Sequence, residues 1–129
     1  MTMADEQKAV EEQLAQLQLA EQNLQSFVGQ RQQFQMELLE IEHALTEMEK
    51  SNGAIFRNIG PLMIAVEKKD LKKDLTNRKE ILELRIKNLE KQEAQLREKA
   101  KGLQSHIVAK LEASKKESLE YKPSDVHNR

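Results

Sequence analysis

The side chains best suited to acid–base chemistry or metal binding in this sequence are three histidines and the carboxylates near them. His43 follows Glu40 and Glu42 closely, whereas His106 and His127 lie far along the chain from it. A hydrolytic or metal site needs several such groups converging on one point. Carboxylates beside a histidine are common on an exposed helix, so we expect no catalytic residue, no metal ligand and no bound cofactor.

Other patterns that carry chemistry are also missing. The four glycines are scattered singly, so no phosphate-binding loop is predicted, and no serine lies in the context of a nucleophile elbow. The net charge is −1, with 21 basic and 22 acidic side chains interspersed. Binding to phosphate backbones usually leaves a basic stripe. The densest basic group is interrupted by acidic residues: Lys68, Lys69, Asp70, Lys72, Lys73 and Asp74. We therefore expect neither an enzyme nor a nucleic-acid-binding protein.

The composition is typical of long exposed helices. Of the 129 residues, 33% are charged and only 3% are aromatic, with a mean hydropathy of −0.75. There is no cysteine, and hence no disulfide framework. The longest apolar run, 59–66, is too short to cross a bilayer. No charged stretch followed by an apolar core opens the sequence, so we expect no signal peptide. These features predict a cytoplasmic protein without a membrane partner.

Two ladders of apolar residues with a seven-residue period predict two helices that pack on each other. The numbers of their opposing members add up to 120, which predicts a chain folded back near residue 60. The first ladder comprises Met3, Val10, Leu17, Leu24, Arg31, Leu38 and Leu45, and the second Leu75, Leu82, Leu89, Leu96 and Leu103.

Local signals set the expected boundaries. Good helix formers fill 4–51, a length of roughly 70 Å in helical form, and Ser51-Asn52-Gly53 is a suitable stop. The second helix is expected at 68–118, followed by a disordered tail at 119–129. The predicted fold class is all-α dominated: a long antiparallel two-helix coiled coil with one β-hairpin, 54–66, at the connection.

The hairpin around Gly60-Pro61 is apolar on both faces, and its turn type stays open. Proline is disfavoured at the third residue of a tight turn unless its bond is cis, so the turn could also be shifted or looser. A lone two-stranded hairpin is marginal in water, and its edges are free to pair. We therefore expect hairpins from several chains to join into an intersubunit β-barrel. The expected assembly residues are Ile55, Phe56, Ile59, Gly60, Pro61, Leu62, Met63, Ile64 and Val66.

Apolar residues beyond the ladders lie in the outer half of the helix pair. Leu19 is a lone leucine in a polar column, and Val108 sits beside Ile107. Scattered exposed apolar residues are normal on any protein, and the alternative is that they bind an apolar client. The candidate client-binding residues are Val10, Leu14, Leu17, Leu19, Ile107, Val108 and Leu111.

Two stretches, 54–66 (AIFRNIGPLMIAV) and 77–97 (NRKEILELRIKNLEKQEAQLR), resemble the prefoldin beta subunit. The resemblance covers roughly residues 8 to 112. An alpha subunit would carry two hairpins between its helices, and this chain has room for one. Archaeal beta chains are the nearest in appearance, and eukaryotic beta-type subunits also fit.

The resemblance implies a hexamer of two prefoldin alpha subunits and four beta subunits, whose hairpins form a double barrel carrying six coiled coils. It implies an ATP-independent chaperone that captures unfolded proteins at the coiled-coil tips and delivers them to a group II chaperonin. The alternative is a structural or tethering coiled-coil protein that self-assembles through its hairpin. A coiled-coil DNA binder would need a basic segment leading into the ladders, and neither ladder has one.

Overall fold

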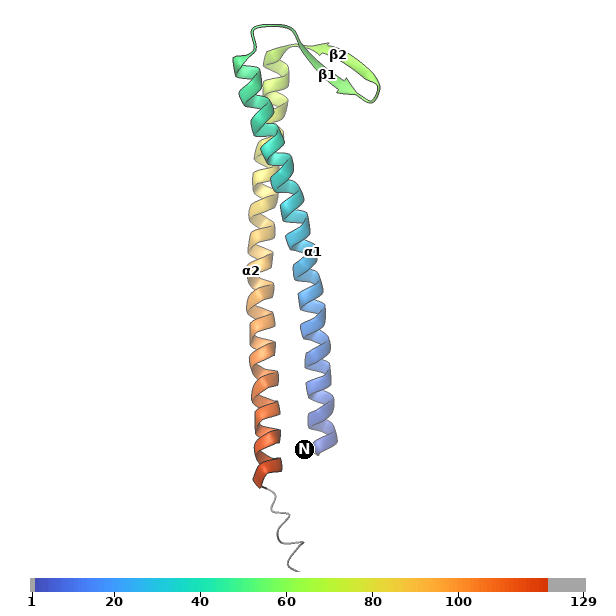
Figure 1. The fold of residues 1–129 in the computed structure, drawn as a ribbon, viewed down its shortest axis with the longest axis vertical. Helices are drawn as coiled ribbons and strands as arrows, with labels where there is room; N and C mark the ends of the chain where they lie inside the picture. The colour runs from blue at the N-terminus through green and yellow to red at the C-terminus, as the bar shows by residue number, and fades with distance from the viewer. Residues whose placement is uncertain (1, 121–129) are drawn as a thin grey trace, which may run out of the picture. The chain divides into compact units, whose positions relative to one another are not determined.

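The structure is a computed structural model that describes residues 2–120. Its elements are α1 (Met3–Lys50), β1 (Ile55–Ile59), β2 (Leu62–Val66) and α2 (Lys68–Glu120), so two long helices enclose one antiparallel hairpin in the sequence (Figure 1). This is the predicted fold class. Of the tail predicted at 119–129, residues 119 and 120 end α2, and 121–129 lie outside the described residues.

The start and the end of α1 follow from local hydrogen bonds. The Oγ1 of Thr2 accepts a bond of 3.2 Å from the backbone N–H of Asp5, and the Thr2 N–H donates at 3.3 Å to Asp5 Oδ2. This reciprocal cap satisfies N–H groups that the first turn leaves unpaired. At the other end, the Ser51 N–H still bonds Glu47 O at 3.1 Å before the chain leaves the helix.

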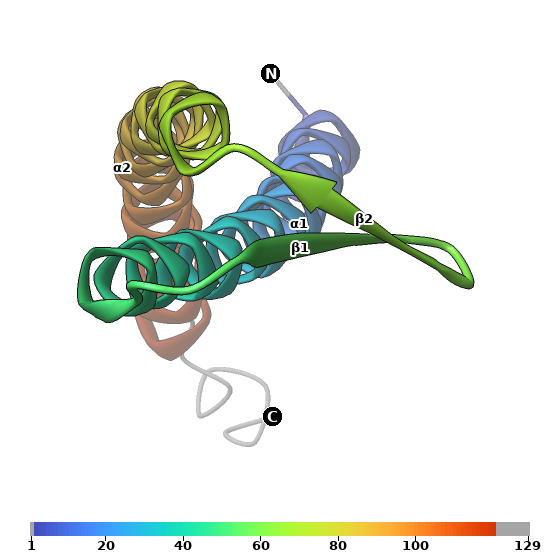
Figure 2. The same cartoon turned by 90° about the horizontal axis from the view of Figure 1, so that it is seen from above.

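Gly60 and Pro61 form an unshifted two-residue turn. Ile59 pairs directly with Leu62, and Ile55 pairs with Val66 at the other end of the hairpin. Figure 2 shows the hairpin from above. Gly60 has φ +58°, and no non-glycine residue among 2–120 has a positive φ and no peptide bond there is cis. A positive φ at the first central position alone is the type II′ pattern. Proline suits the second position of this turn, because φ there is negative.

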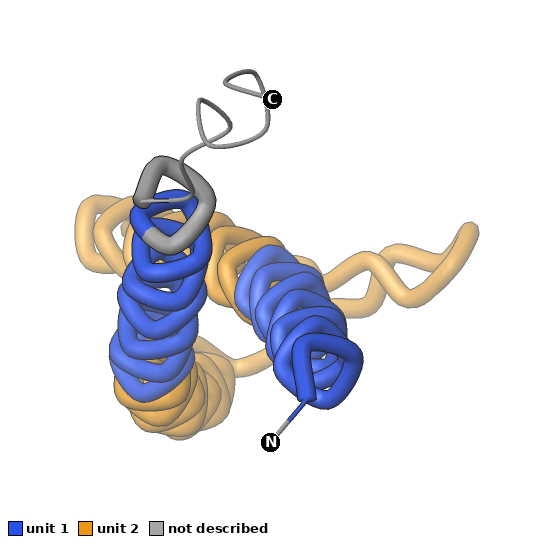
Figure 3. Tube along the Cα trace, turned by 90° about the horizontal axis from the view of Figure 1, so that it is seen from below, with its two compact units in different colours: residues 1–25, 94–129 blue, residues 26–93 orange. Residues whose placement is uncertain are grey.

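The chain divides into two compact units, coloured in Figure 3. Unit 2, residues 26–93, contains the hairpin and the adjoining helical segments, which run antiparallel. Unit 1, residues 1–25 and 94–129, contains the first part of α1 and the last part of α2. Each unit buries a narrow seam instead of a globular core. The buried apolar residues are Ile41, Met48, Leu82, Ile86 and Leu89 in unit 2, and Ala20 and Ile107 in unit 1.

Ion pairs in unit 2 show how its two helical segments are aligned. Lys72 Nζ lies 2.6 Å from Glu49 Oε1, and Lys79 Nζ lies 3.8 Å from Glu42 Oε1. The residue numbers of each pair add up to 121. The segments therefore pair about the hairpin within one residue of the alignment that the ladders predict.

Candidate assembly and client-binding surfaces

The strand register sorts the hairpin side chains into two faces, because successive side chains of a strand point to opposite sides. We call the first the Arg57 face and the second the Phe56 face. The Arg57 face carries Ile55, Arg57, Ile59, Leu62, Ile64 and Val66, and the Phe56 face carries Phe56, Asn58, Met63 and Ala65. Each face thus holds one polar side chain among apolar ones.

Most of these apolar side chains remain accessible to solvent. Leu62 is 62% exposed and Met63 70%, and Phe56, Ile59 and Ile64 are also exposed. Only the end of the hairpin next to the helices, Ile55 and Val66, is half-buried. Both faces are therefore uncovered in the single chain, and every expected apolar assembly residue belongs to one of them.

Polar contacts tie together the segments that hold the hairpin. Lys68 Nζ donates to the carbonyl oxygen of Ser51 at 3.2 Å, which joins the start of α2 to the segment leaving α1. The hydrogen bond from Lys72 lowers the pKa of Glu49, because it favours the charged carboxylate. In β1, Arg57 Nη1 donates to Asp74 Oδ2 at 3.2 Å. These contacts place the hairpin beside the first turns of α2.

The seven candidate client-binding residues all fall in unit 1, but they differ in exposure. Leu19 is 58% exposed and Leu111 56%, and Leu14 and Val108 are also exposed, whereas Val10 and Leu17 are half-buried. Ile107 is only 5% exposed. The burial of Ile107 indicates a packing role within unit 1 in the isolated chain. The four exposed residues are those that a client could reach directly.

The exposed members on α1 lie on different sides of that helix, whereas those on α2 share one side. Val108 and Leu111 are three residues apart and share a side of α2. Leu14 and Leu19 are about 140° apart around α1, since each residue turns a helix by about 100°. Unit 1 thus exposes apolar side chains at several positions where a client could bind.

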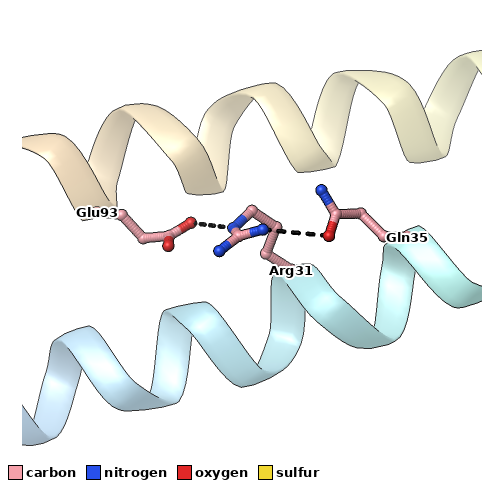
Figure 4. Close-up of polar contacts among 3 residues, drawn as sticks. All are labelled: Arg31, Gln35 and Glu93. Atoms are coloured by element: carbon pink, nitrogen blue, oxygen red, sulfur yellow. Dashed lines mark hydrogen bonds and ion pairs between the residues drawn. The ribbon is translucent and has the colours of Figure 1, made fainter.

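A polar cluster inside the seam of unit 2 was not predicted (Figure 4). Arg31 Nε donates to Glu93 Oε2 at 2.6 Å, and Arg31 Nη1 donates to Gln35 Oε1 at 3.1 Å. The Glu93 side chain is 1% exposed, and its bond to Arg31 raises the pKa of the guanidinium. The ladders placed Arg31 opposite Leu89, but its long side chain reaches one turn further. The sequence signal that could have indicated this cluster was an arginine at a position of the ladder that is otherwise apolar.

Unit 2 also exposes four large apolar side chains on its helices that belong to neither ladder and were not singled out from the sequence: Met36, Leu39, Ile81 and Leu84. Ile81 lines a shallow groove together with Leu82, Glu37, Arg78 and Arg85. No group of three or more histidine, cysteine or acidic side chains in residues 2–116 is arranged to hold a metal ion. The helices of this part of the chain also lack an apolar stretch long enough to cross a membrane.

Comparisons with known proteins give one consistent result. The Prefoldin subunit family profile matches residues 11–114. Prefoldin subunit beta of Archaeoglobus fulgidus is 39% identical over 88 residues, which are 67% of this chain and 76% of the relative. Prefoldin subunit beta of Thermococcus onnurineus is 36% identical over 104 residues, 79% of this chain and 90% of the relative. The crystal structure of the prefoldin beta subunit from Thermococcus strain KS-1 aligns with a TM-score of 0.72 at 35% identity, covering 78% of this chain and 90% of that one.

Proposed function

Since this chain belongs to the prefoldin subunit family, a family of chaperones, we propose that it is a beta-type subunit that holds unfolded proteins without ATP and delivers them to a group II chaperonin. We further propose that it acts in the cytoplasm, in a hexamer of two alpha-type and four beta-type subunits. It performs no catalysis in this scheme. It acts by binding unfolded proteins reversibly.

The observation that carries the proposal is the uncovered hairpin. Five of its large apolar side chains are exposed on two faces, and a two-stranded sheet leaves its outer edges without partners. Fully burying a large aliphatic or aromatic side chain contributes about 1.5–3 kcal/mol. Strands from neighbouring subunits could cover these faces and pair with these edges at the same time. Assembly through the hairpin thus accounts for surface that the single chain leaves in water.

Client holding is assigned to four exposed apolar residues of unit 1: Leu14, Leu19, Val108 and Leu111. An unfolded protein offers many apolar side chains and no fixed shape, so it suits several small contacts better than one deep pocket. Each contact would be weak and quickly reversible. Contacts on several subunits of one particle would add up through avidity, so a client could be held and still be released.

Suppression of aggregation tests this function directly. A chemically unfolded client is diluted into buffer containing the chain and an alpha-type prefoldin subunit, with no nucleotide, and light scattering is followed. We expect scattering to fall in proportion to the assembled complex. Failure to suppress aggregation, combined with a stable complex of this chain alone, would instead favour a structural or tethering coiled coil.

A further inference from the structure

One charged side chain, Arg57, lies at the centre of an otherwise aliphatic face of the hairpin. It is the middle residue of β1 and pairs across the strands with Ile64. A guanidinium costs free energy on a surface that becomes buried unless an acceptor accompanies it. The partner of Arg57 therefore affects how the Arg57 face can be used in an assembly.

That partner is a carboxylate on α2. Arg57 Nη1 donates to Asp74 Oδ2 at 3.2 Å, and the two side chains are 42% and 48% exposed. The guanidinium is thus drawn from the strand toward the helix. Arg57 lies on the face opposite Phe56 and Met63, and its guanidinium reaches Asp74 on α2. Viewed from above, both strands extend away from the ends of the helices (Figure 2).

The other polar contacts of this region act on different parts. The bond from Lys68 to Ser51 O holds the segment between α1 and β1, and the Glu49–Lys72 pair joins the two helices. The Arg57–Asp74 bond joins the middle residue of β1 to α2. It is therefore suited to fix the angle at which the hairpin leaves α2.

We propose that Arg57 is a positioning residue, which sets the angle of the hairpin through Asp74 before subunits join. This inference rests on the assembly described under the proposed function. An exposed ion pair contributes little to folding stability. Its value here is preorganisation, since a hairpin already held at the assembled angle loses less freedom when it binds. The effect is about two- to fivefold per subunit, from the usual size of such pairs, and it multiplies with the number of subunits that carry it.

Charge reversal tests the pair. The variants are Arg57→Asp, Asp74→Arg and the double exchange, which restores opposite charges with the positions swapped. The matched control exchanges Glu42 and Lys79, an ion pair of unit 2 that joins the two helices and does not touch the hairpin. Circular dichroism checks that all variants retain their helices.

The angle is measured by spin labels. The chain has no cysteine, so Asn58→Cys and Asn77→Cys give one label on the strand and one on α2. Electron resonance then reports the distribution of distances between them in the unassembled chain. We expect either single reversal to broaden this distribution and to weaken assembly with an alpha-type subunit, and the double exchange to narrow it and recover assembly. The Glu42 and Lys79 exchange should change neither.

An unchanged distance distribution in Arg57→Asp would overturn the positioning role, and so would a double exchange that recovers nothing. Because the distances are measured without a partner, they remain informative if the parent chain does not assemble. Absence of assembly in the parent would contradict the proposed function, whereas equal assembly by all variants would contradict only the role of Arg57.

Discussion

Arg31 and Glu93 form a hydrogen-bonded ion pair of 2.6 Å across the seam of unit 2, at a site where the Glu93 side chain is almost completely buried. The neighbouring seam positions are apolar, among them Leu89 and Ile86. A polar pair in an apolar seam lowers stability relative to a hydrophobic pair but favours one alignment of the helices. The pair therefore explains how two regular leucine ladders can be held in one register.

Removing one partner of this pair should destabilise unit 2. We expect Arg31→Leu to lower the free energy of unfolding, because the buried Glu93 carboxylate loses Arg31 as a donor. The double variant Arg31→Leu/Glu93→Leu should recover or exceed the parent stability. Urea unfolding followed by circular dichroism measures both. A double variant no more stable than Arg31→Leu would contradict this account.

The hairpin should be needed for assembly and not for the helices. Replacing Ile64 and Val66 by aspartate puts two charges on the Arg57 face, which a neighbouring subunit would have to bury. We expect assembly to be lost while the helical circular dichroism signal changes little. Leu39→Asp is the control, since Leu39 is 65% exposed on a helix of unit 2. Light scattering gives the mass, and an unchanged mass for the hairpin variant would refute the assembly role.

The exposed apolar residues of unit 1 should hold clients without contributing to assembly. Changing Leu19, Val108 and Leu111 to serine is expected to weaken the suppression of aggregation severalfold through lost avidity. Met36→Ser/Leu39→Ser is a control, because these side chains in unit 2 are at least as exposed as the three in unit 1. Equal suppression by the triple variant and the parent would remove the three residues from the site.

Ile107 should behave differently from its neighbour Val108. Its side chain is buried, so Ile107→Ser leaves a cavity and buries a hydroxyl, at a cost of about 2–4 kcal/mol. Val108→Ser, at an exposed position, should cost much less. Hydrogen exchange of unit 1 amides distinguishes the two. Equal protection in both variants would mean that Ile107 does not pack as the structure shows.

Glu49 should titrate abnormally because of Lys72. The hydrogen bond lowers the folded pKa of Glu49, so its contribution to stability is present above the unfolded pKa and is lost as pH falls through the folded pKa. Both side chains are exposed, so the effect is small. We expect Lys72→Met to raise the pKa of Glu49 toward its ordinary value in an NMR titration. The same pKa in both proteins would contradict the bond.

The sequence predicted the helices and the hairpin well, because both follow from local chemistry and a regular period. The helices span Met3–Lys50 and Lys68–Glu120, where the sequence predicted 4–51 and 68–118. The turn type could not be predicted from the sequence. Whether Pro61 fits the second central position depends on the sign of φ at Gly60. The Glu93 contact and the burial of Ile107 depend on side-chain reach and packing between distant segments. A seven-residue period carries neither kind of information.

The most direct test of the account is the mass of the complex that forms when this chain is mixed with an alpha-type prefoldin subunit. Native mass spectrometry or light scattering should give one species with two alpha-type and four beta-type subunits, and the Ile64→Asp/Val66→Asp variant should give none. A parent chain that keeps the same mass with and without the alpha-type subunit would contradict assembly through the hairpin.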